Sequence, residues 1–255
     1  RMNNIIQGVD TYWLALGLRT AFSQRHSVYV DGGENNVRWG VELNFNGNNG
    51  VMQKSNRNVT GAGFYVDYRI GKFQVKNKTT FTFGSSNDVP FNSFSDYSHL
   101  NPYLRIYDED GNYLRKLESF SGYSGSLVNP LYEIHNYNSY DKSNYYEIVD
   151  NLLVNWNITK DLRLRLQMSA TIKRENSELY KDPASASYGT ANLSLNGDKS
   201  VSSGDSNIID GTLQLMYNKS IKKHYLNMNL SSNLRSSKYT TEYADYRGFP
   251  GGDLT

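Results

Sequence analysis

The sequence predicts an all-β fold, namely an antiparallel transmembrane β-barrel segment with long extracellular loops and short periplasmic turns. Along most of the chain, apolar and polar residues alternate with a period of two, as they do in a strand with one apolar and one polar face. Short and long connections also follow one another strictly, an asymmetry typical of outer-membrane barrels. Aromatic residues recur beside the short turns on the apolar phase, where amphipathic rings meet a membrane–water interface.

The first three strands are expected between residues 37 and 83. In Val37–Phe45 the apolar residues occupy the odd positions, with polar residues or glycine between them. The same alternation runs through Ala62–Ile70 and returns in Phe73–Phe83 after the link Gly71-Lys72. A two-residue link of this kind joins neighbouring antiparallel strands as a hairpin. These segments therefore predict three strands, the last two joined by a tight turn.

The clearest strand covers residues 162–173, where six apolar residues alternate with six polar ones. Residues 146–158 upstream follow the same pattern, with Val149 and Asp150 as the exceptions. The link Thr159–Asp161 between the two segments has the length of a hairpin turn. A second pair of antiparallel strands is therefore expected here.

Two further alternating segments, residues 209–217 and 226–234, bring the expected number of membrane strands to seven. No segment keeps a helical period over a long stretch, and Thr11–Leu18 is the only short helix candidate. An even number of strands is the rule for complete single-chain bacterial barrels. Because the chain begins at Arg1 without a signal peptide, we expect a processed or excised fragment.

The connections differ sharply in length. Those at 71–72, 159–161 and about 219–223 are short, whereas 84–145 and 174–206 are long and rich in Ser, Asn, Gly and Tyr. Outer-membrane barrels combine tight periplasmic turns with long extracellular loops. The two long segments are therefore expected outside the cell.

A girdle of aromatic residues is expected at the lipid interface near the short turns. From Tyr146 to Trp156 the strand makes ten steps of about 3.3 Å each, and tilted by about 45° it spans about 23 Å, close to the apolar band of such barrels, which is about 25 Å tall. Ordinary aromatic enrichment in strands is the alternative reading. The interface aromatics are Trp39, Tyr68, Phe73, Trp156 and Tyr217, and a second girdle at the opposite strand ends would contain Phe45, Phe64, Phe81 and Phe83.

The polar phase of the same strands is expected to face the lumen of the barrel. It would form a wall in contact with water and a plug, and a substrate path is the less favoured interpretation. The lumen-facing residues are Lys76, Lys78, Glu147, Arg163, Arg165 and Gln167.

Composition excludes several classes of function. The chain has no cysteine, which rules out disulfides and thiolate chemistry, and its net charge of +2 does not indicate nucleic-acid binding. The four histidines lack metal-ligand spacing, and we find no nucleophile elbow, phosphate loop or zinc-protease helix. Asp108–Gly111 resembles a calcium loop only faintly and is better interpreted as a turn. We therefore expect no enzyme, no cofactor and no metal site.

Residues 19–53 resemble the junction between plug and barrel in SusC/RagA-type TonB-dependent outer-membrane transporters. The shared order is a strand over His26–Val30, a turn at Gly32-Gly33, an aromatic strand over Val37–Phe45, and a loop containing Gly50-Val51.

Other parts of the chain resemble the same family. The TYWL at 11–14 is similar to its Thr-Asp-Trp-Leu, with Tyr12 in place of the acidic residue. Residues 101–117 and 129–133 resemble the first large extracellular loop, and 247–255 resemble a later one.

The resemblance implies a division of the chain into the end of the plug over 1–36 and the N-terminal part of a 22-stranded barrel over 37–255. It implies import of a glycan or peptide across a bacterial outer membrane, driven by TonB through regions absent from this chain. A SusD-like surface lipoprotein would cover the extracellular face and touch loops such as 101–117. The loop residues expected to contact substrate are Tyr103, Tyr107 and Tyr113.

Two other classes remain open. A secreted β-sandwich that binds glycans would bury the apolar phase between two sheets. A small structural or adhesive outer-membrane barrel would pair its first and last strands.

Overall fold

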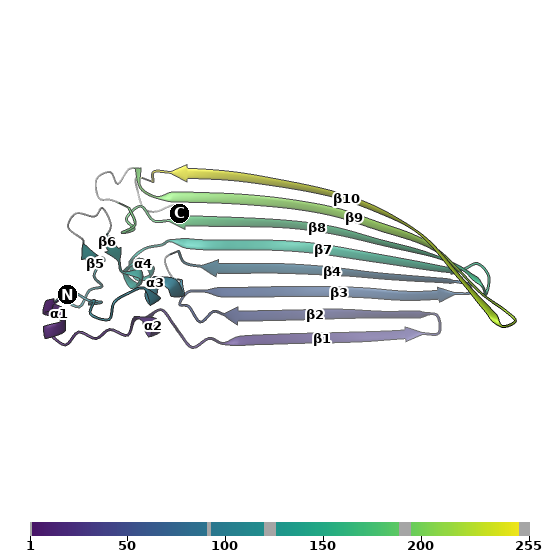
Figure 1. Cartoon of the computed structure of the whole chain (residues 1–255), viewed down its shortest axis with the longest axis horizontal. Coiled ribbons are helices and arrows are strands. Elements are labelled where there is room, and N and C mark those ends of the chain that lie inside the picture. Colours follow the sequence, from purple (N-terminus) through teal and green to yellow (C-terminus); the bar gives the residue numbers. More distant parts are fainter. Residues whose placement is uncertain (1, 91–92, 120–125, 189–194, 250–255) are drawn as a thin grey trace.

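The main element of the structure is one antiparallel sheet of eight strands in the order β1-β2-β3-β4-β7-β8-β9-β10 (Figure 1). The structure is a computed structural model, and it describes residues 2–90, 93–119, 126–188 and 195–249. Strands make up 65% of the described residues and helices 9%. The predicted all-β antiparallel class is confirmed. The sheet is open, because β1 and β10 are its two edges and do not pair with each other.

The strands lengthen steadily across the sheet, from 12 residues in β1 to 24 in β9 and β10. All seven segments expected from the alternation lie within observed strands, the segment over 146–158 except for its last residue. The strands are β1 (Ser23–Glu34), β2 (Val37–Asn49), β3 (Asn56–Ile70), β4 (Phe73–Asp88), β7 (Tyr140–Asn157), β8 (Leu162–Lys181), β9 (Asp198–Ile221) and β10 (His224–Arg247).

One strand was not counted among the expected membrane strands. β1 pairs with β2 along its whole length, from Ser23 opposite Asn48 to Glu34 opposite Val37. Its alternation is blurred because His26 shares a phase with Val28, whereas Tyr29 lies on the other one. The sheet therefore has eight strands instead of seven, and the predicted division of the chain after residue 36 does not coincide with a break in the sheet and stays a prediction.

Strand register gathers the apolar phases of all strands on one side of the sheet. Directly opposed residues of an antiparallel pair share a face, and one row of such partners runs from Leu43 through Ala62, Phe81 and Ile148 to Ile172. We call this side the apolar face and the other the polar face. Side chains of the apolar face are open to the surroundings, with Leu43 53% and Phe81 49% exposed. The described residues form only one other sheet, the two-stranded β5–β6.

The two ends of the sheet differ. At the turn end the strands are joined by residues 35–36, 71–72, 158–161 and 222–223, whereas the loop end has connections over 50–55, 89–139 and 182–197. The long loops are therefore shorter than the expected 84–145 and 174–206. The strands continue past the alternating segments, as where Asn144 pairs with Asn176, because backbone hydrogen bonding does not require an apolar face.

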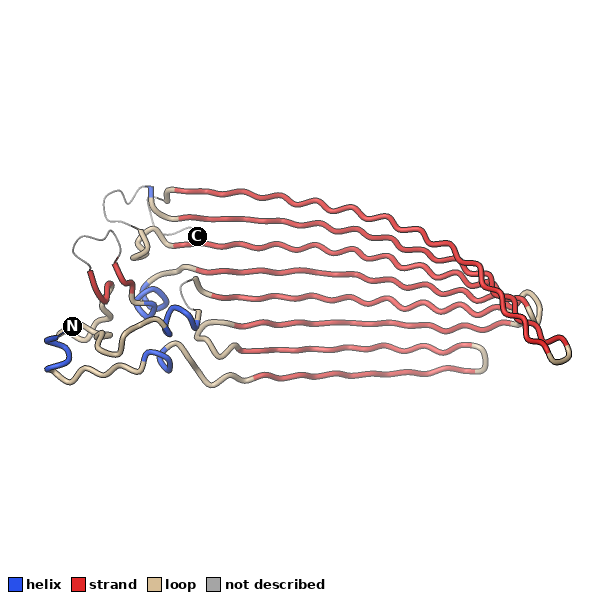
Figure 2. Tube along the Cα trace, in the orientation of Figure 1, coloured by secondary structure: helices blue, strands red, loops and turns tan. Residues whose placement is uncertain are grey.

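The helices and the small sheet lie at the loop end (Figure 2). The helix expected within Thr11–Leu18 is present but shorter, as α2. No helix in the described residues is long and apolar enough to cross a membrane. These elements are α1 (Met2–Ile6), α2 (Trp13–Leu16), α3 (Phe94–Ser98), α4 (Pro130–Asn136), β5 (Lys116–Ser119) and β6 (Ser126–Val128).

A small apolar core holds the loop end together. Its buried members come from α2, α3, α4 and the loop between α3 and β5, and they are Trp13, Tyr97, Leu104, Leu131 and Ile134. The Trp13 indole N–H donates to the carbonyl of Asn101 at 3.1 Å, and the Thr11 hydroxyl donates to that of Leu104 at 2.8 Å. We call residues 2–18, 93–119 and 126–139 the cap. The N-terminal segment is thus packed onto the first long loop.

Candidate functional site: a two-faced sheet and its cap

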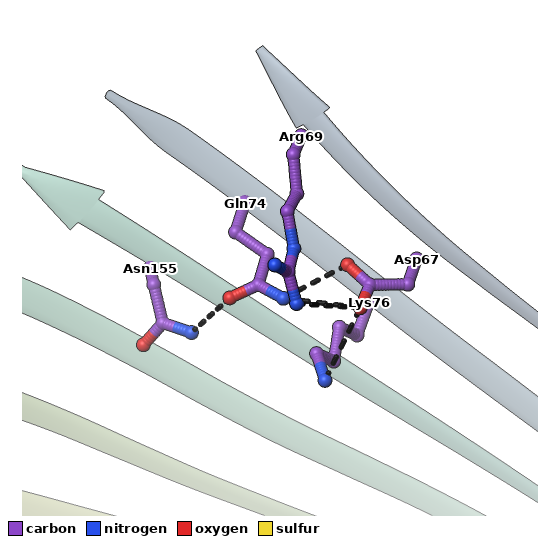
Figure 3. Close-up of polar contacts among 5 residues, drawn as sticks. All are labelled: Asp67, Arg69, Gln74, Lys76 and Asn155. Atoms are coloured by element: carbon purple, nitrogen blue, oxygen red, sulfur yellow. Dashed lines mark hydrogen bonds and ion pairs between the residues drawn. The ribbon is translucent and has the colours of Figure 1, made fainter. Parts of the chain in front are cut away.

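A chain of hydrogen bonds crosses the polar face from β3 to β8, and Figure 3 shows its part from Asp67 on β3 to Asn155 on β7. Gln74 donates from Nε2 to both carboxylate oxygens of Asp67, at 2.9 and 3.1 Å, and accepts at Oε1 from the amide of Asn155 at 3.3 Å. The other amide atom of Asn155, Oδ1, accepts from Arg165 Nε at 2.9 Å. Lys76 Nζ lies 3.2 Å from Asp67 Oδ2. Four neighbouring strands are therefore joined by side chains as well as by backbone.

The structure brings together four of the six residues predicted to face the lumen. All six occupy the polar phase in the observed register. A cavity of about 390 Å³ on this face is lined by Lys76, Lys78, Arg165 and Gln167, whereas Glu147 and Arg163 lie outside its lining. Arg163 instead donates from Nε to Asn157 Oδ1 at 2.8 Å, near the turn end. Their exposure to a lumen stays a prediction.

The five predicted interface aromatics lie on the apolar face toward the turn end. Phe73 is directly opposite Trp156, and the two rings stack with centroids 5.3 Å apart and planes 11° from parallel. Trp39 is opposite Val66, Tyr68 is opposite Val75, and Tyr217 is opposite Leu162. Their role at a lipid interface stays a prediction, but the register puts all five on one side of the sheet.

One polar cluster interrupts the apolar face. Asp150 Oδ1 accepts from the Thr79 hydroxyl at 2.6 Å and from Asn77 Nδ2 at 2.9 Å. All three residues share the apolar phase with neighbours such as Phe64 and Leu152. The carboxylate that breaks the sequence pattern therefore has local hydrogen-bond donors, as a carboxylate in apolar surroundings requires.

The three loop tyrosines do not form one surface. Tyr113 stacks on His135 at 5.0 Å and packs beside Tyr107 at 4.9 Å, so it belongs to the packing of the cap. A hydrogen bond with the Tyr107 side chain raises the pKa of Tyr113 above its ordinary value. Tyr107 and Tyr103 are 45% and 39% exposed. Contact of the three tyrosines with substrate stays a prediction.

Glu133 joins the two long loops. It lies on α4, is 1% exposed, and accepts at Oε1 from the backbone N–H of Ala186 at 2.7 Å. Arg115 supports the same junction by donating to the carbonyl of Ala184 at 2.9 Å. Burial raises the pKa of Glu133 above its ordinary value, although hydrogen bonds from Ser185 and from the Ala186 N–H and the charge of Arg115 oppose this shift. The carboxyl group of Glu133 is therefore a titratable contact between the two long loops.

Neither α4 nor Glu133 was predicted from the sequence, although a local signal for the helix is present. Asn129 is the N-cap of α4, its side chain accepts from the Leu131 N–H at 3.1 Å, and Pro130 follows in the first turn. Asn followed by Pro is a common helix start. The buried position of Glu133 depends on the second long loop and has no comparable signal.

The Asp108–Gly111 segment forms the expected turn. The Asp108 carboxylate accepts from the backbone N–H groups of Asp110 and Asn112, at 3.0 and 2.8 Å, and Gly111 has a φ of 84°. The Oδ1 atom of Asp108 is thus occupied by the turn itself. Tyr107 and Tyr113, on either side of this turn, form a single antiparallel bridge.

No family model matches the sequence, and no curated protein matches it. Several solved structures share its fold, among them three structures of RagAB. A RagAB peptide importer in the closed-closed state aligns with a TM-score of 0.77 and 15% identity over 96% of this chain. The RagAB peptide transporter aligns with 0.78 and 15% over 97%, and the importer in its open-open state with 0.77 and 16% over 96%.

This chain covers only 27–28% of the length of those solved chains. At such low identity the likeness shows the fold alone. The eight-stranded open sheet with its cap therefore has the fold of a segment of a known transporter chain.

Proposed function

We propose that this chain forms part of the wall of a TonB-dependent outer-membrane importer. In this proposal the apolar face contacts lipid, the polar face lines the lumen, and the long loops with the cap lie outside the cell. The observation that carries it is the pair of opposite faces that the alternating segments form across the sheet, because an exposed apolar face of this extent marks a surface that meets membrane or partner. The fold likeness to transporter chains supports it independently.

The two alternative classes are less well supported. A β-sandwich needs a second sheet against the apolar face, and the described residues supply only the small β5–β6 pair at the loop end. A small closed barrel needs β1 to pair with β10, and these strands are the two edges of the described sheet. An open sheet also leaves unpaired backbone groups at its edges, which lipid does not tolerate. Further strands in the intact protein would satisfy them.

Cargo and partners are part of the proposal. The similar solved structures are named as a peptide importer, which favours a peptide over a glycan as the imported nutrient. A SusD-like surface lipoprotein would contact the outer side of the cap, where Tyr103 and Tyr107 are exposed. TonB would supply energy through regions outside this chain.

Deletion of the full gene tests this function. With TonB intact, the deletion strain should lose growth on at least one peptide or polysaccharide supplied as the only nutrient of its kind. Purification of the full-length protein should recover a surface lipoprotein, and a protein lacking residues 101–117 should recover less of it. Unchanged growth on every such nutrient, with no lipoprotein recovered, would refute the importer and favour a structural role.

A further inference from the structure

An apolar residue lies among the charges of the polar face. Leu153 on β7 is directly opposite Lys76 on one side and Gln167 on the other. It forms part of the lining of the cavity of about 390 Å³ described above. A water-filled wall has no need for leucine at this position. The combination of an apolar floor and polar sides is instead typical of a binding site.

The charges around this floor are mostly positive. The lining contains three cationic side chains, Lys76, Lys78 and Arg165, and one carboxylate, that of Asp67. Asp67 is already engaged by Gln74, Arg69 and Lys76. Among the described residues, no hydrogen bond or ion pair holds the Lys78 ammonium group. A surplus of positive charge is therefore left facing the cavity.

Arg165 is held in a defined orientation. Its Nε donates to Asn155 Oδ1 at 2.9 Å, and Asn155 is 8% exposed and donates in turn to Gln74. This contact uses the inner nitrogen of the guanidinium group, and within the described part of the chain the two terminal nitrogens have no side-chain partner. Two parallel N–H groups of arginine match the two oxygens of a carboxylate.

We infer that this cavity binds a carboxylate that carries an apolar group. The carboxylate would lie between Lys78 and Arg165, and the apolar group would lie on Leu153. The inference rests on the proposed function, because the polar face must line a lumen for a ligand to reach it. The C-terminus of a peptide has this chemistry, and so has an acidic side chain from another segment of the full-length protein. A neutral sugar does not, since it gains little from a surplus of positive charge.

The test uses the full-length protein in detergent and an alanine tetrapeptide that ends in leucine, with its C-terminus either free or amidated. Calorimetry should detect binding of the free acid and not of the amide. Lys78→Gln and Arg165→Gln should each weaken it about tenfold. Lys78→Gln is the safer variant for folding, because its ammonium group holds no partner in the described structure. Arg163→Gln, on the same strand and face but outside the cavity, is the matched control and should change binding by less than about twofold.

A second readout identifies the source of the carboxylate. If an acidic side chain of the protein fills the cavity, the peptide will not bind, and Lys78→Gln will lower the thermal unfolding midpoint more than Arg163→Gln does. Equal binding of acid and amide would overturn the inference. The inference would also be overturned if Lys78→Gln and Arg165→Gln had the same effect as Arg163→Gln on both peptide binding and the unfolding midpoint. If the variants change neither peptide binding nor the unfolding midpoint while nutrient uptake is normal, only this inference fails. If the variants change either readout but deletion of the gene leaves uptake unaffected, only the importer proposal fails.

Discussion

An arginine placed at Leu166 should destabilise the folded protein in the membrane strongly. Leu166 lies on the apolar face, opposite Val154 of β7 and Leu213 of β9. It is four residues from Leu162 and six from Ile172, the ends of the alternating segment of β8. At about 3.3 Å per residue and a tilt of about 45°, these ends lie about 9 and about 14 Å away along the membrane normal. Leu166 is therefore close to the bilayer midplane.

The expected cost follows from this depth. Arginine on the lipid face of a barrel costs about 2–4 kcal/mol at the midplane and about 0–1 kcal/mol near the interface. Leu166→Arg should thus lower the free energy of unfolding by about 2–4 kcal/mol, whereas Leu162→Arg near the turn should lower it by about 0–1 kcal/mol. Gln167→Arg is the matched control, since this neighbour occupies the polar face. Its effect should stay within about 0.5 kcal/mol.

The assay is denaturant unfolding of the full-length protein in lipid vesicles, followed by the shift of the folded band on a gel. The difference between Leu166→Arg and Gln167→Arg is the informative quantity, because both add one positive charge to the same strand. An equal cost for both variants, or a larger cost at Gln167, would refute the assignment of the apolar face to lipid.

Two further predictions concern the loop end. Protease added to intact cells should cut within 93–119 or 182–197 and spare Gly71-Lys72 until the outer membrane is broken; early cleavage at Gly71-Lys72 would reverse the orientation. Burial raises the pKa of Glu133, so the folded protein favours the neutral carboxyl group. The contribution of Glu133 to loop docking is therefore full below the ordinary pKa of a glutamate and is lost as the pH rises through the raised pKa. Hydrogen-exchange protection of the Ala186 amide should therefore fall with rising pH in the wild type and stay level in Glu133→Gln. Level protection in both proteins would contradict a pH-dependent contact between Glu133 and Ala186.

Alternation predicted the sheet because pleating puts neighbouring residues on opposite faces. The segment over 162–173 lies wholly inside β8, and its phase matches that of its neighbours β7 and β9. The outer ends of the strands were not predictable in the same way. Beyond the alternating segments both faces are polar, as at Asn176 and Ser177, so no pattern marks where pairing stops.

The cap depends on contacts that a local pattern does not report. Trp13 packs with Tyr97 and donates to Asn101, more than eighty residues away in the chain. Family resemblance assigned residues 1–36 to the junction with a plug, and no periodicity in that segment indicated that α2 would pack on the first long loop. The start of α4 at Asn129-Pro130 could have been predicted from the sequence, but the hydrogen bond between Glu133 and Ala186 forms only when both loops are folded.

The candidate site on the polar face was predicted in part. The polar phase identified Lys76, Lys78 and Arg165 individually. Their common cavity requires β4 to pair with β7 across a connection of about fifty residues, and no sequence signal sets that register. Leu153 was overlooked for a simpler reason, since it directly follows Leu152 in a segment whose alternation is already broken at Val149 and Asp150.

The claim that the apolar face meets lipid and the polar face meets a water-filled lumen is tested most directly at two adjacent residues. Leu164 and Arg165 occupy opposite faces of β8, opposite Trp156 and Asn155 of β7 respectively. Single cysteines at these positions, in a protein that has none in this chain, would be labelled in intact outer membranes with a water-soluble and a lipid-soluble maleimide. The lipid-soluble reagent should label position 164, and the water-soluble reagent should label position 165. The reverse pattern, with position 165 in lipid and position 164 in water, would contradict it.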